Sequence, residues 1–365
     1  MNLSATATSG DRGFNEAREW RRFLVMLLLV ICPSLIMIGA LEALAWRIGE
    51  TRTMEAIAQW QSAKPGRMWR GGDGRSYLAY KVARVRLLKP EVIMLGASRG
   101  ISFRADTVQP YTFYNAGVTA WTFNHYRRFL ELVTSAGYRP KVLFFNFDYW
   151  MFSKDFDKYW IERFYEQPPS HWENIKFFLD ELQKRPIVIY RRLPATDQLK
   201  GLYAVLSGEG FREDGSLPGV PPTPDPKRLD DDPMAVGVPP VELGDEFAEE
   251  QIVEFERFVA FAKSKNISLI GIQVPYYAKI LTGLNKNPRA GIWREFRSDM
   301  RHAYFESKGI VFFDFADMPE YRDKPEYFID SIHPDSRVFG DIIRRILADA
   351  RVRAVLPGAQ AGPKP

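Results

Sequence analysis

The amino-acid sequence predicts an α/β protein, a three-layer sandwich with a central parallel sheet, preceded by one N-terminal transmembrane helix. The first observation is a continuous apolar run at residues 23–46. The second is an alternation of short apolar runs with amphipathic stretches from position 91 onward. The strand-like runs are "VIML", "TFYN", "KVLFFNF", "ISLIGIQV" and "IVFFDF". Short apolar strands separated by amphipathic helices are typical of a parallel sheet that is covered on both faces.

The apolar run at residues 23–46 is interrupted only by Ser34 and Glu42 among polar side chains. At about 1.5 Å per residue it reaches roughly 36 Å, which is enough to cross a hydrocarbon core of about 30 Å. Three arginines at positions 18–22 precede it. Under the positive-inside rule they place residues 1–22 in the cytoplasm as a leader. Everything after Trp46 is then expected on the other side of the membrane.

A cleaved signal peptide is the alternative, because Ala-Leu-Ala at 43–45 has the small-x-small form of a cleavage site. The apolar run is longer than the ~7–15 residues of a signal peptide's apolar region, which favours an uncleaved anchor. Both alternatives export the remainder, so we expect a single-pass protein of the inner (cytoplasmic) membrane that faces the periplasm. Cys32, the only cysteine, lies inside the anchor, which excludes disulfides and cysteine-ligated metals from the exported part.

The exported part divides into stretches of different composition. Residues 47–88 read as a helical, charged membrane-proximal segment with a Gly-rich interruption, and 89–350 carry the alternating α/β pattern. Within this domain, residues 214–241 are dense in proline, glycine and aspartate, which predicts an irregular insertion. Residues 351–365 read as a loose tail.

Charge and histidine content narrow the classes of function. The net charge is only +5, and no lysine/arginine run interleaved with aromatics is typical of a nucleic-acid surface. We therefore expect no nucleic-acid partner. Of the four histidines, His125 lies in an amphipathic stretch, His171 near a helix start and His302 among charged residues. We expect His125 to be structural, His171 to be a surface or capping residue, and His302 to be solvated. No pair has metal-ligand spacing, so we expect neither a metal nor a cofactor.

Two motifs far apart in the chain carry candidate chemistry. In "EVIMLGASRG" an apolar run ends at Gly96, and Ser98 and Arg99 follow in a turn of small residues. Such a turn is also typical of a strand-to-helix connection in which serine caps the helix. In "YFIDSIHPDSRVFGD" Asp330 precedes His333 by three residues, just before the last predicted helix. A carboxylate there can fix the tautomer of the imidazole and stabilise its protonated form, although D-x-x-H also occurs by chance.

Together, these motifs resemble the SGNH (GDSL-like) hydrolase superfamily. "FYNAGVTAWT" matches its second block, and "VLFFNFDYW" stands where its third block lies, so that the resemblance spans residues 91–347. It implies an SGNH/flavodoxin-like fold and a triad of Ser98 as nucleophile, His333 as general base and Asp330 as the orienting carboxylate. The chemistry fits these residue types, because a serine is a weak nucleophile until a base takes its proton.

The resemblance also implies an oxyanion hole formed by the N–H groups of Ser98 and Gly117, with Asn146 as a candidate side-chain donor. The sequence departs from the family in two places. Ser98 stands in G-A-S-R rather than G-D-S-L, and Asn146 stands in F-F-N-F-D, without the family's G-x-N-D. Asp148 is therefore a second candidate for the third-block residue that is oriented into the site.

With the N-terminal anchor, these variants look like the branch that includes the alginate O-acetylation proteins and other envelope acyl-transfer proteins. "QVPYYAKILTGLNKNPRAGIWREFRSDM" also resembles a segment of anchored members in which a Pro-Tyr pair follows a sheet strand. This implies that Tyr276 and Tyr277 lie near the cleft, either touching substrate or packing beside it. Arg99 is a candidate for holding an anionic sugar, and equally for a salt bridge to a nearby carboxylate.

The resemblance implies a membrane-anchored serine esterase or O-acyltransferase that acts on acyl, chiefly acetyl, esters of an envelope or secreted polysaccharide. Its substrates would be a polysaccharide or an acyl donor, and a membrane-bound O-acyltransferase is a candidate partner. Whether water or a sugar hydroxyl accepts the acyl group stays open. The rival is a non-catalytic, anchored polysaccharide-binding or assembly protein that keeps the fold without the chemistry.

Overall fold

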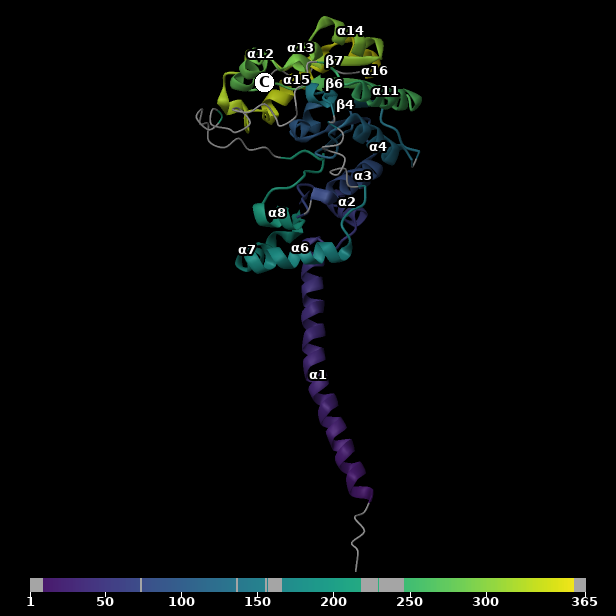
Figure 1. Ribbon diagram of the computed structural model, residues 1–365, viewed down its shortest axis with the longest axis vertical. Helices are drawn as coiled ribbons and strands as arrows, with labels where there is room; N and C mark the ends of the chain where they lie inside the picture. The colour runs from purple at the N-terminus through teal and green to yellow at the C-terminus, as the bar shows by residue number, and fades with distance from the viewer. Residues whose placement is uncertain are drawn as a thin grey trace, which may run out of the picture.

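Five parallel strands form the central sheet, in the order β3-β2-β4-β6-β7 (Figure 1). The computed structural model describes residues 9–72, 74–135, 137–154, 156, 166–217, 229 and 246–357. The strands of the sheet are β2 Val92–Gly96, β3 Phe113–Gly117, β4 Val142–Asn146, β6 Ser268–Gln273 and β7 Ile310–Asp314. The predicted α/β class with a parallel sheet is confirmed.

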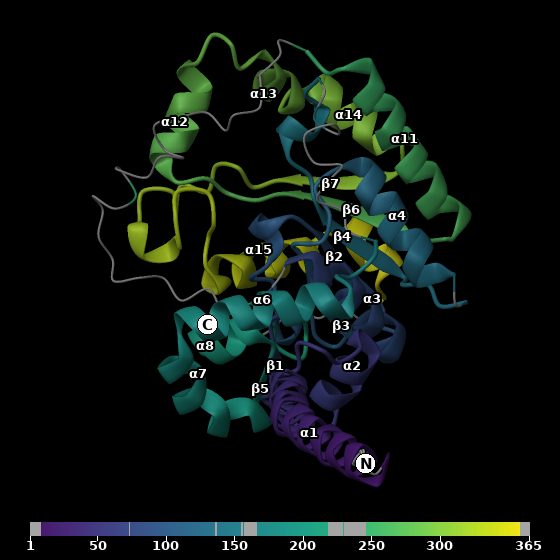
Figure 2. The ribbon, with the colours of Figure 1, turned by 60° about the horizontal axis from the view of Figure 1, so that its bottom comes forward.

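Helices cover both faces of this sheet (Figure 2). The helices are α1 Ser9–Ile48, α2 Met54–Ser62, α3 Tyr77–Leu88, α4 Phe123–Thr134, α6 His171–Lys184, α7 Pro186–Arg192, α8 Leu202–Ser207, α11 Glu249–Ser264, α12 Ala278–Lys286, α13 Gly291–Phe296, α14 Asp299–Ser307, α15 Ser336–Ala348 and α16 Ala350–Val355. Alternate strand residues enter different cores, since side chains along a strand point to opposite faces. Ile93 and Leu95 pack with α3, α4 and α11, whereas Val92 and Met94 pack with α15 and α16.

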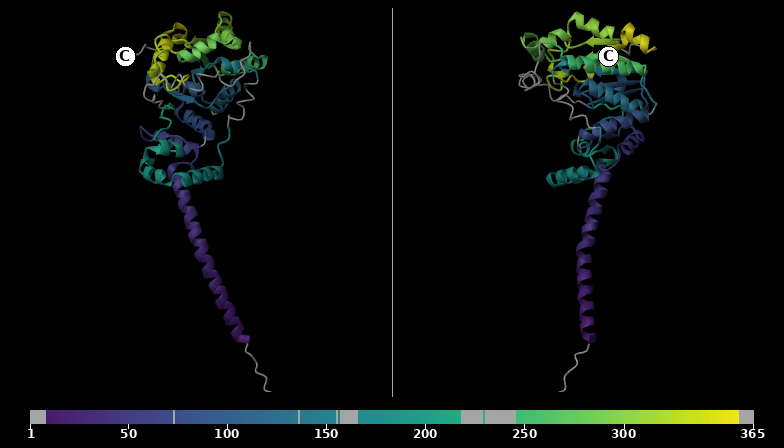
Figure 3. Two further views of the ribbon diagram at one scale, coloured as in Figure 1. Left: turned by 60° about the vertical axis from the view of Figure 1, so that its left-hand side comes forward. Right: turned by 45° about the vertical axis from the view of Figure 1, so that its right-hand side comes forward.

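The helix α1 projects from the rest of the molecule as a single rod (Figures 1 and 3). Its part from Arg18 to Ile48 is long and apolar enough to span a membrane. Side chains at 18–40 are exposed, and contact with the rest of the protein begins at about residue 41. The predicted leader and anchor are thus parts of one continuous helix from Ser9 onward, while residues 1–8 lie outside the described part.

A small layer of helices and two short strands lies between α1 and the sheet. It contains segments from both sides of the predicted domain boundary at residue 89. Its two short strands, β1 Met68–Trp69 and β5 Leu199–Lys200, pair in parallel although they are far apart in sequence. Around them the end of α1 packs with α6, α7 and α8. In contrast α3, which falls in the predicted membrane-proximal segment, packs on the sheet. Burial of apolar faces, rather than chain order, therefore decides which segments belong together.

The described start of the predicted irregular insertion, residues 214–217, contains no helix or strand. The carbonyl of Asp214 accepts a hydrogen bond at 2.7 Å from the backbone N–H of Asn115 on β3, which attaches this start to the sheet. Apart from 214–217 and Leu229, the predicted insertion lies outside the described residues. The start of the predicted tail forms α16 and is packed rather than loose, because Val352 in this helix and Leu356 directly after it are fully buried. Residues 358–365 of that tail also lie outside the described residues.

Candidate active site

Ser98 lies at the carboxyl edge of the sheet, directly after β2. The chain passes from β2 to β3 on one side and then returns to β4 on the other side of β2. In open α/β sheets, this reversal opens a crevice at the carboxyl ends of the strands, where ligands bind. Ser98 begins a short 3₁₀ turn, Ser98–Gly100, and is partly exposed. The topology therefore presents its hydroxyl at a position that is typical of functional sites.

The three predicted triad residues lie in one chain of hydrogen bonds. His333 Nε2 lies 2.8 Å from Ser98 Oγ, although the two residues are 235 positions apart. His333 Nδ1 lies 2.8 Å and 2.7 Å from the two carboxylate oxygens of Asp330. The predicted association of Ser98, His333 and Asp330 is thus present in the structure. This arrangement allows the imidazole to take the Ser98 proton while the carboxylate holds the opposite ring nitrogen.

The Asp330 carboxylate is organised by its own loop. Its Oδ1 accepts hydrogen bonds from the backbone N–H groups of Ile332 at 3.0 Å and His333 at 2.9 Å. Burial raises the pKa of Asp330, but the hydrogen bond and charge of His333 and these N–H groups outweigh it, so the net pKa is lowered. The carboxyl group therefore stays ionised in the folded protein. The stability this contributes is present above the unfolded-state pKa and is lost as pH falls through the lowered folded-state value.

Arg99 connects the serine turn to the histidine loop. Its Nε donates to the carbonyl of Ile332 at 3.2 Å, next to His333. Its Nη1 donates to Asp148 and to the Tyr276 hydroxyl, the latter at 2.7 Å. Its Nη2 donates to the carbonyls of Val274 at 2.6 Å and Pro275 at 3.2 Å. These contacts use all five N–H donors of a guanidinium. They tie the ends of β2, β4 and β6 to the loop that carries His333.

Of the two predicted roles for Arg99, the structure shows the ion pair. Arg99 and Asp148 are each 2% exposed and lie in direct contact. Burial raises the pKa of the Asp148 carboxyl, and the charge of Arg99 together with a hydrogen bond from Gln273 offsets part of that rise. Asp148 therefore relies on Arg99 to remain charged. Contact of either residue with substrate stays a prediction.

Tyr276 and Tyr277 lie near the triad but are buried. The ring of Tyr276 stacks under the Arg99 guanidinium, 4.0 Å from its centroid. The backbone N–H of Tyr277 donates to the carbonyl of Ser331 at 3.1 Å, and its ring packs with Phe328. Tyr277 therefore supports the loop that carries Asp330 and His333, whereas Tyr276 supports the Arg99 guanidinium. Of their two predicted roles, packing is the one these contacts show, and substrate contact stays a prediction.

Asn146, the predicted side-chain donor, lies against the serine turn. A Cβ at Gly96 would lie 2.3 Å from Asn146 Oδ1, and one at Gly100 would lie 2.5 Å from the same atom. Only glycine at these two positions admits so close an approach. Both polar atoms of the Asn146 amide are buried without a hydrogen-bond partner among the described residues. A buried unsatisfied amide is rare and costs about 1–3 kcal/mol, so it calls for an explanation.

The predicted role of Gly117 needs correction. Its backbone N–H donates to Asn115 Oδ1 at 2.8 Å, so this N–H is already satisfied and does not point to a free oxyanion position. The Asn115 amide nitrogen donates in turn to the carbonyls of Gly100 at 2.9 Å, Ile101 at 3.1 Å and Phe103 at 2.9 Å. Asn115 therefore fixes the chain that follows Ser98 onto β3. This role of Asn115 was not predicted from the sequence, in which its signal is an asparagine inside a buried strand.

The other three histidines lie outside this network. His125 is 3% exposed in α4, and burial lowers its pKa to about 3, as fits a structural residue. His171 is exposed at the start of α6, which confirms the predicted surface position. His302 was expected in solvent, but its ring packs 4.9 Å from that of Phe312 and its Nε2 is buried. No group of three or more His, Cys, Asp or Glu side chains suited to a metal occurs among the described residues.

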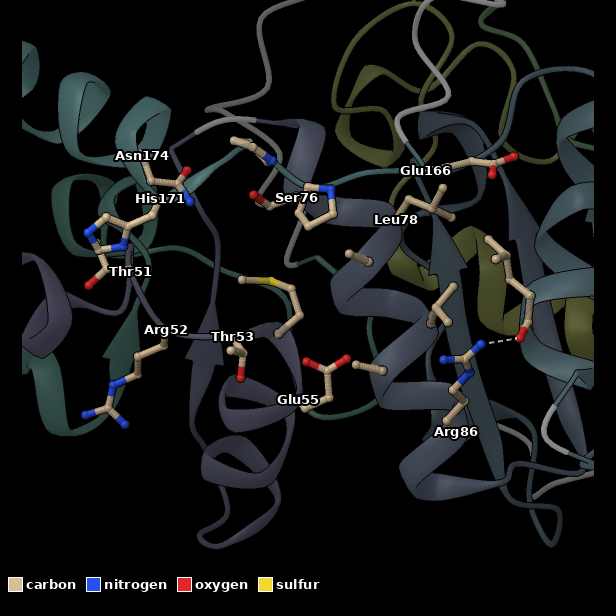
Figure 4. A pocket seen from close by; sticks show the side chains of 17 residues that line it. Thr51, Arg52, Thr53, Glu55, Ser76, Leu78, Arg86, Glu166, His171 and Asn174 are labelled. Atoms are coloured by element: carbon tan, nitrogen blue, oxygen red, sulfur yellow. Dashed lines mark hydrogen bonds between the residues drawn. The ribbon is translucent and has the colours of Figure 1, made fainter.

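A cavity of about 540 Å³ lies away from the triad, beside the small layer between α1 and the sheet. Residues from the start of α2, from α3 and from the start of α6 line it, as Figure 4 shows. Charges of both signs, including Arg52, Glu55 and Arg86, border it. No predicted site residue lines this cavity, so the cavity is not part of the candidate active site.

Comparison of the chain with known protein families, with curated proteins and with solved structures finds no match. The geometry of the site and the physical chemistry of its residues therefore carry the functional argument.

Proposed function

We propose that the protein is a membrane-anchored serine esterase or O-acyltransferase with an SGNH-like, flavodoxin-type three-layer fold. The observation that carries the proposal is the chain of hydrogen bonds from Ser98 through His333 to Asp330, at 2.8 Å and 2.7 Å. Its position beside the reversal of strand order, between β2 and β4, is a second support. Acyl transfer through serine requires these three roles in this geometry.

In the proposed reaction, Ser98 Oγ attacks the carbonyl of an ester while His333 Nε2 takes the hydroxyl proton. Asp330 stabilises the imidazolium that forms. His333 then protonates the departing alcohol, and an acyl-serine remains. A water or a sugar hydroxyl, deprotonated by His333, then attacks this acyl group. The bond from the acyl carbon to Ser98 Oγ breaks, and His333 returns the proton to Ser98 Oγ.

The tetrahedral intermediates need hydrogen-bond donors for their oxyanion. The backbone N–H of Ser98 opens a helical turn, where the first N–H groups have no intrahelical partner. The amide of Asn146, buried beside this turn without a partner among the described residues, supports its assignment as the second donor. Gly117, whose N–H is held by Asn115, is not part of this proposal.

The proposed substrates are acyl, chiefly acetyl, esters of an envelope or secreted polysaccharide, with the catalytic domain on the periplasmic side of the inner membrane. This assignment rests on the resemblance and on α1, which is long and apolar enough to span a membrane. A membrane-bound O-acyltransferase is the proposed partner if the reaction is transfer. Acylation of an added oligosaccharide, as opposed to release of free acetate, would distinguish transfer from hydrolysis.

The test uses the full-length protein in nanodiscs with an activated acetyl ester and an acetylated oligosaccharide. We expect Ser98→Ala and His333→Ala each to lower kcat by up to about 10⁶-fold, and Asp330→Asn by about 10⁴-fold. Ser264→Ala is the matched control, because the hydroxyl of this exposed serine at the end of α11 donates to a carbonyl of its own helix.

Equal turnover by the wild type and Ser98→Ala would refute the mechanism. Absence of turnover in the wild type, with glycan binding that Ser98→Ala leaves unchanged, would favour the non-catalytic polysaccharide-binding alternative.

A further inference from the structure

The helices α6 and α7 lie across the end of α1, at the base of the folded part (Figures 1 and 3). His171, the first residue of α6, bonds to Glu42 of α1 through Nε2 and Oε1 at 2.8 Å. The inward faces of both helices pack with the last turns of α1 through Ile175, Phe178 and Ile189. The two helices therefore have a fixed position along α1.

The length of α1 gives the level of these helices relative to a bilayer. A hydrocarbon core of about 30 Å corresponds to roughly 20 helical residues at about 1.5 Å each. Counted from Phe23, where the apolar run begins, this length ends at Glu42. Glu42 is the residue that His171 contacts. If α1 spans the membrane, α6 and α7 lie at the level of the lipid headgroups.

Several large apolar side chains are exposed on the outward surfaces of α6 and α7, beside charged residues of α6 such as Lys176 and Asp180. Trp172 is 74% exposed, Ile187 64% and Tyr190 75%, and Leu179 and Val188 are also exposed. Trp172 and Leu179 are seven residues apart on α6, and Ile187 and Tyr190 are three apart on α7, so each pair shares one helix face. We call these five residues the α6–α7 patch. Tryptophan and tyrosine are the residues that membrane interfaces favour.

Basic residues border the patch. Arg191 and Arg192 end α7, both are exposed, and neither makes an ion pair within the described part of the chain. An apolar stripe of Trp, Leu and Ile flanked by arginine is typical of helices that lie in the plane of a membrane surface. Free arginines there attract anionic headgroups.

We propose that the α6–α7 patch is a membrane-binding surface that inserts into the headgroup region of a leaflet containing anionic phospholipid. The bilayer that holds α1 is the partner, because the patch is continuous with the end of that helix. Two attachments, one spanning and one lying in the interface, hold the folded part at a fixed height and tilt. This inference rests on the spanning role of α1 and is independent of the proposed chemistry.

The test places single fluorescent labels in the full-length protein, reconstituted in nanodiscs of zwitterionic and anionic phospholipid. In a Cys32→Ser background, Leu179→Cys, Ile187→Cys and Tyr190→Cys each carry an environment-sensitive dye. The matched control is Met300→Cys on α14. Met300 is 66% exposed, and α14 lies at the far end of the molecule from α1 (Figure 1).

Phospholipids with a nitroxide near the headgroup are expected to remove most of the fluorescence from the three patch labels and to leave the Met300 label unchanged. Iodide in the buffer is expected to quench the Met300 label and to leave the three patch labels largely unquenched. Patch labels that iodide quenches as strongly as the Met300 label, and that nitroxide lipids do not quench, would overturn the proposal.

A separate label on the native Cys32 tests the spanning role of α1, since this residue is exposed on that helix. Quenching of this label by lipids with a nitroxide deep in the acyl chain shows that α1 is in the bilayer. If the nitroxide lipids quench the Cys32 label but not the patch labels, only the proposed interfacial surface is overturned. If they do not quench the Cys32 label, the membrane span on which the inference rests is overturned.

Discussion

The buried guanidinium of Arg99 yields a quantitative prediction for stability. Arg99→Met removes five donors and leaves Asp148 as an uncompensated buried charge, since the two side chains are 2% and 3% exposed. Removal of one partner of a buried ion pair costs about 3–5 kcal/mol. The carbonyls of Val274, Pro275 and Ile332 also lose a donor, at roughly 1 kcal/mol each. We expect a loss of at least about 6 kcal/mol in the free energy of unfolding, within a total that is typically about 5–15 kcal/mol.

A double-mutant cycle identifies the source of this loss. Asp148→Asn removes the charge that Arg99→Met would leave unpaired, so the double variant is expected to be more stable than the sum of the single effects predicts, by about 1–3 kcal/mol. If Arg99→Met does not fold, Arg99→Lys keeps the charge but has three donors, so at least two of the five contacts are lost, at roughly 1 kcal/mol each.

The assay is denaturant unfolding of the full-length chain followed by tryptophan fluorescence, to which Trp150 contributes because its ring lies 5.2 Å from the Arg99 guanidinium. The control is Arg104→Met, which breaks a 2.7 Å ion pair with Asp106 whose side chains are 38% and 59% exposed. We expect that control to change stability by less than about 1 kcal/mol. Two results would refute the proposed role of Arg99 in tying the strand ends to the loop that carries His333. One is a loss of stability in Arg99→Met no larger than that in Arg104→Met, and the other is strict additivity in the double-mutant cycle.

Three further predictions concern other residues. Because burial lowers the folded-state pKa of His125 to about 3, the folded protein binds fewer protons than the unfolded chain below pH 6.5. The wild type should therefore lose about 2 kcal/mol from this group between pH 8 and pH 5, and denaturation midpoints of His125→Phe should show a shallower pH dependence. Asn146→Ala removes a buried amide without a partner among the described residues, so the unfolding midpoint should not fall, while kcat should drop about 10²- to 10³-fold if the amide is an oxyanion donor. A lower midpoint with unchanged kcat would contradict that role. Leu356→Ala should cost about 2–5 kcal/mol because the side chain is fully buried, whereas the exposed Arg353→Ala should be neutral in the same melts, and equal midpoints would contradict the core role of Leu356.

Local patterns in the sequence predicted those features that depend on neighbours along the chain. The hydrogen bond between Asp330 and His333 joins residues three positions apart, so a single loop is enough to form it. The strand that ends at Gly96 could be recognised because a short apolar run and a turn residue are local signals. The apolar run at residues 23–46 predicted a membrane-spanning helix for the same reason, since length and composition alone define it.

Other features depend on how distant segments pack, and only the tertiary structure decided them. Ser98 meets His333 because parallel strands bring their carboxyl ends to one edge of the sheet, across 235 positions of chain. The five acceptors of Arg99 come from the ends of two other strands and from the loop that carries His333. No spacing in the sequence could therefore reveal these contacts.

The hydrogen bond that occupies the N–H of Gly117 depends on which way the Asn115 side chain turns inside the packed strand, which no motif specifies. The small layer between α1 and the sheet joins β1 to β5 across about 130 residues, because only together do these segments bury their apolar faces. A local sequence pattern shows which face of a helix or strand is apolar. Which element packs against that face is determined by how the whole chain folds.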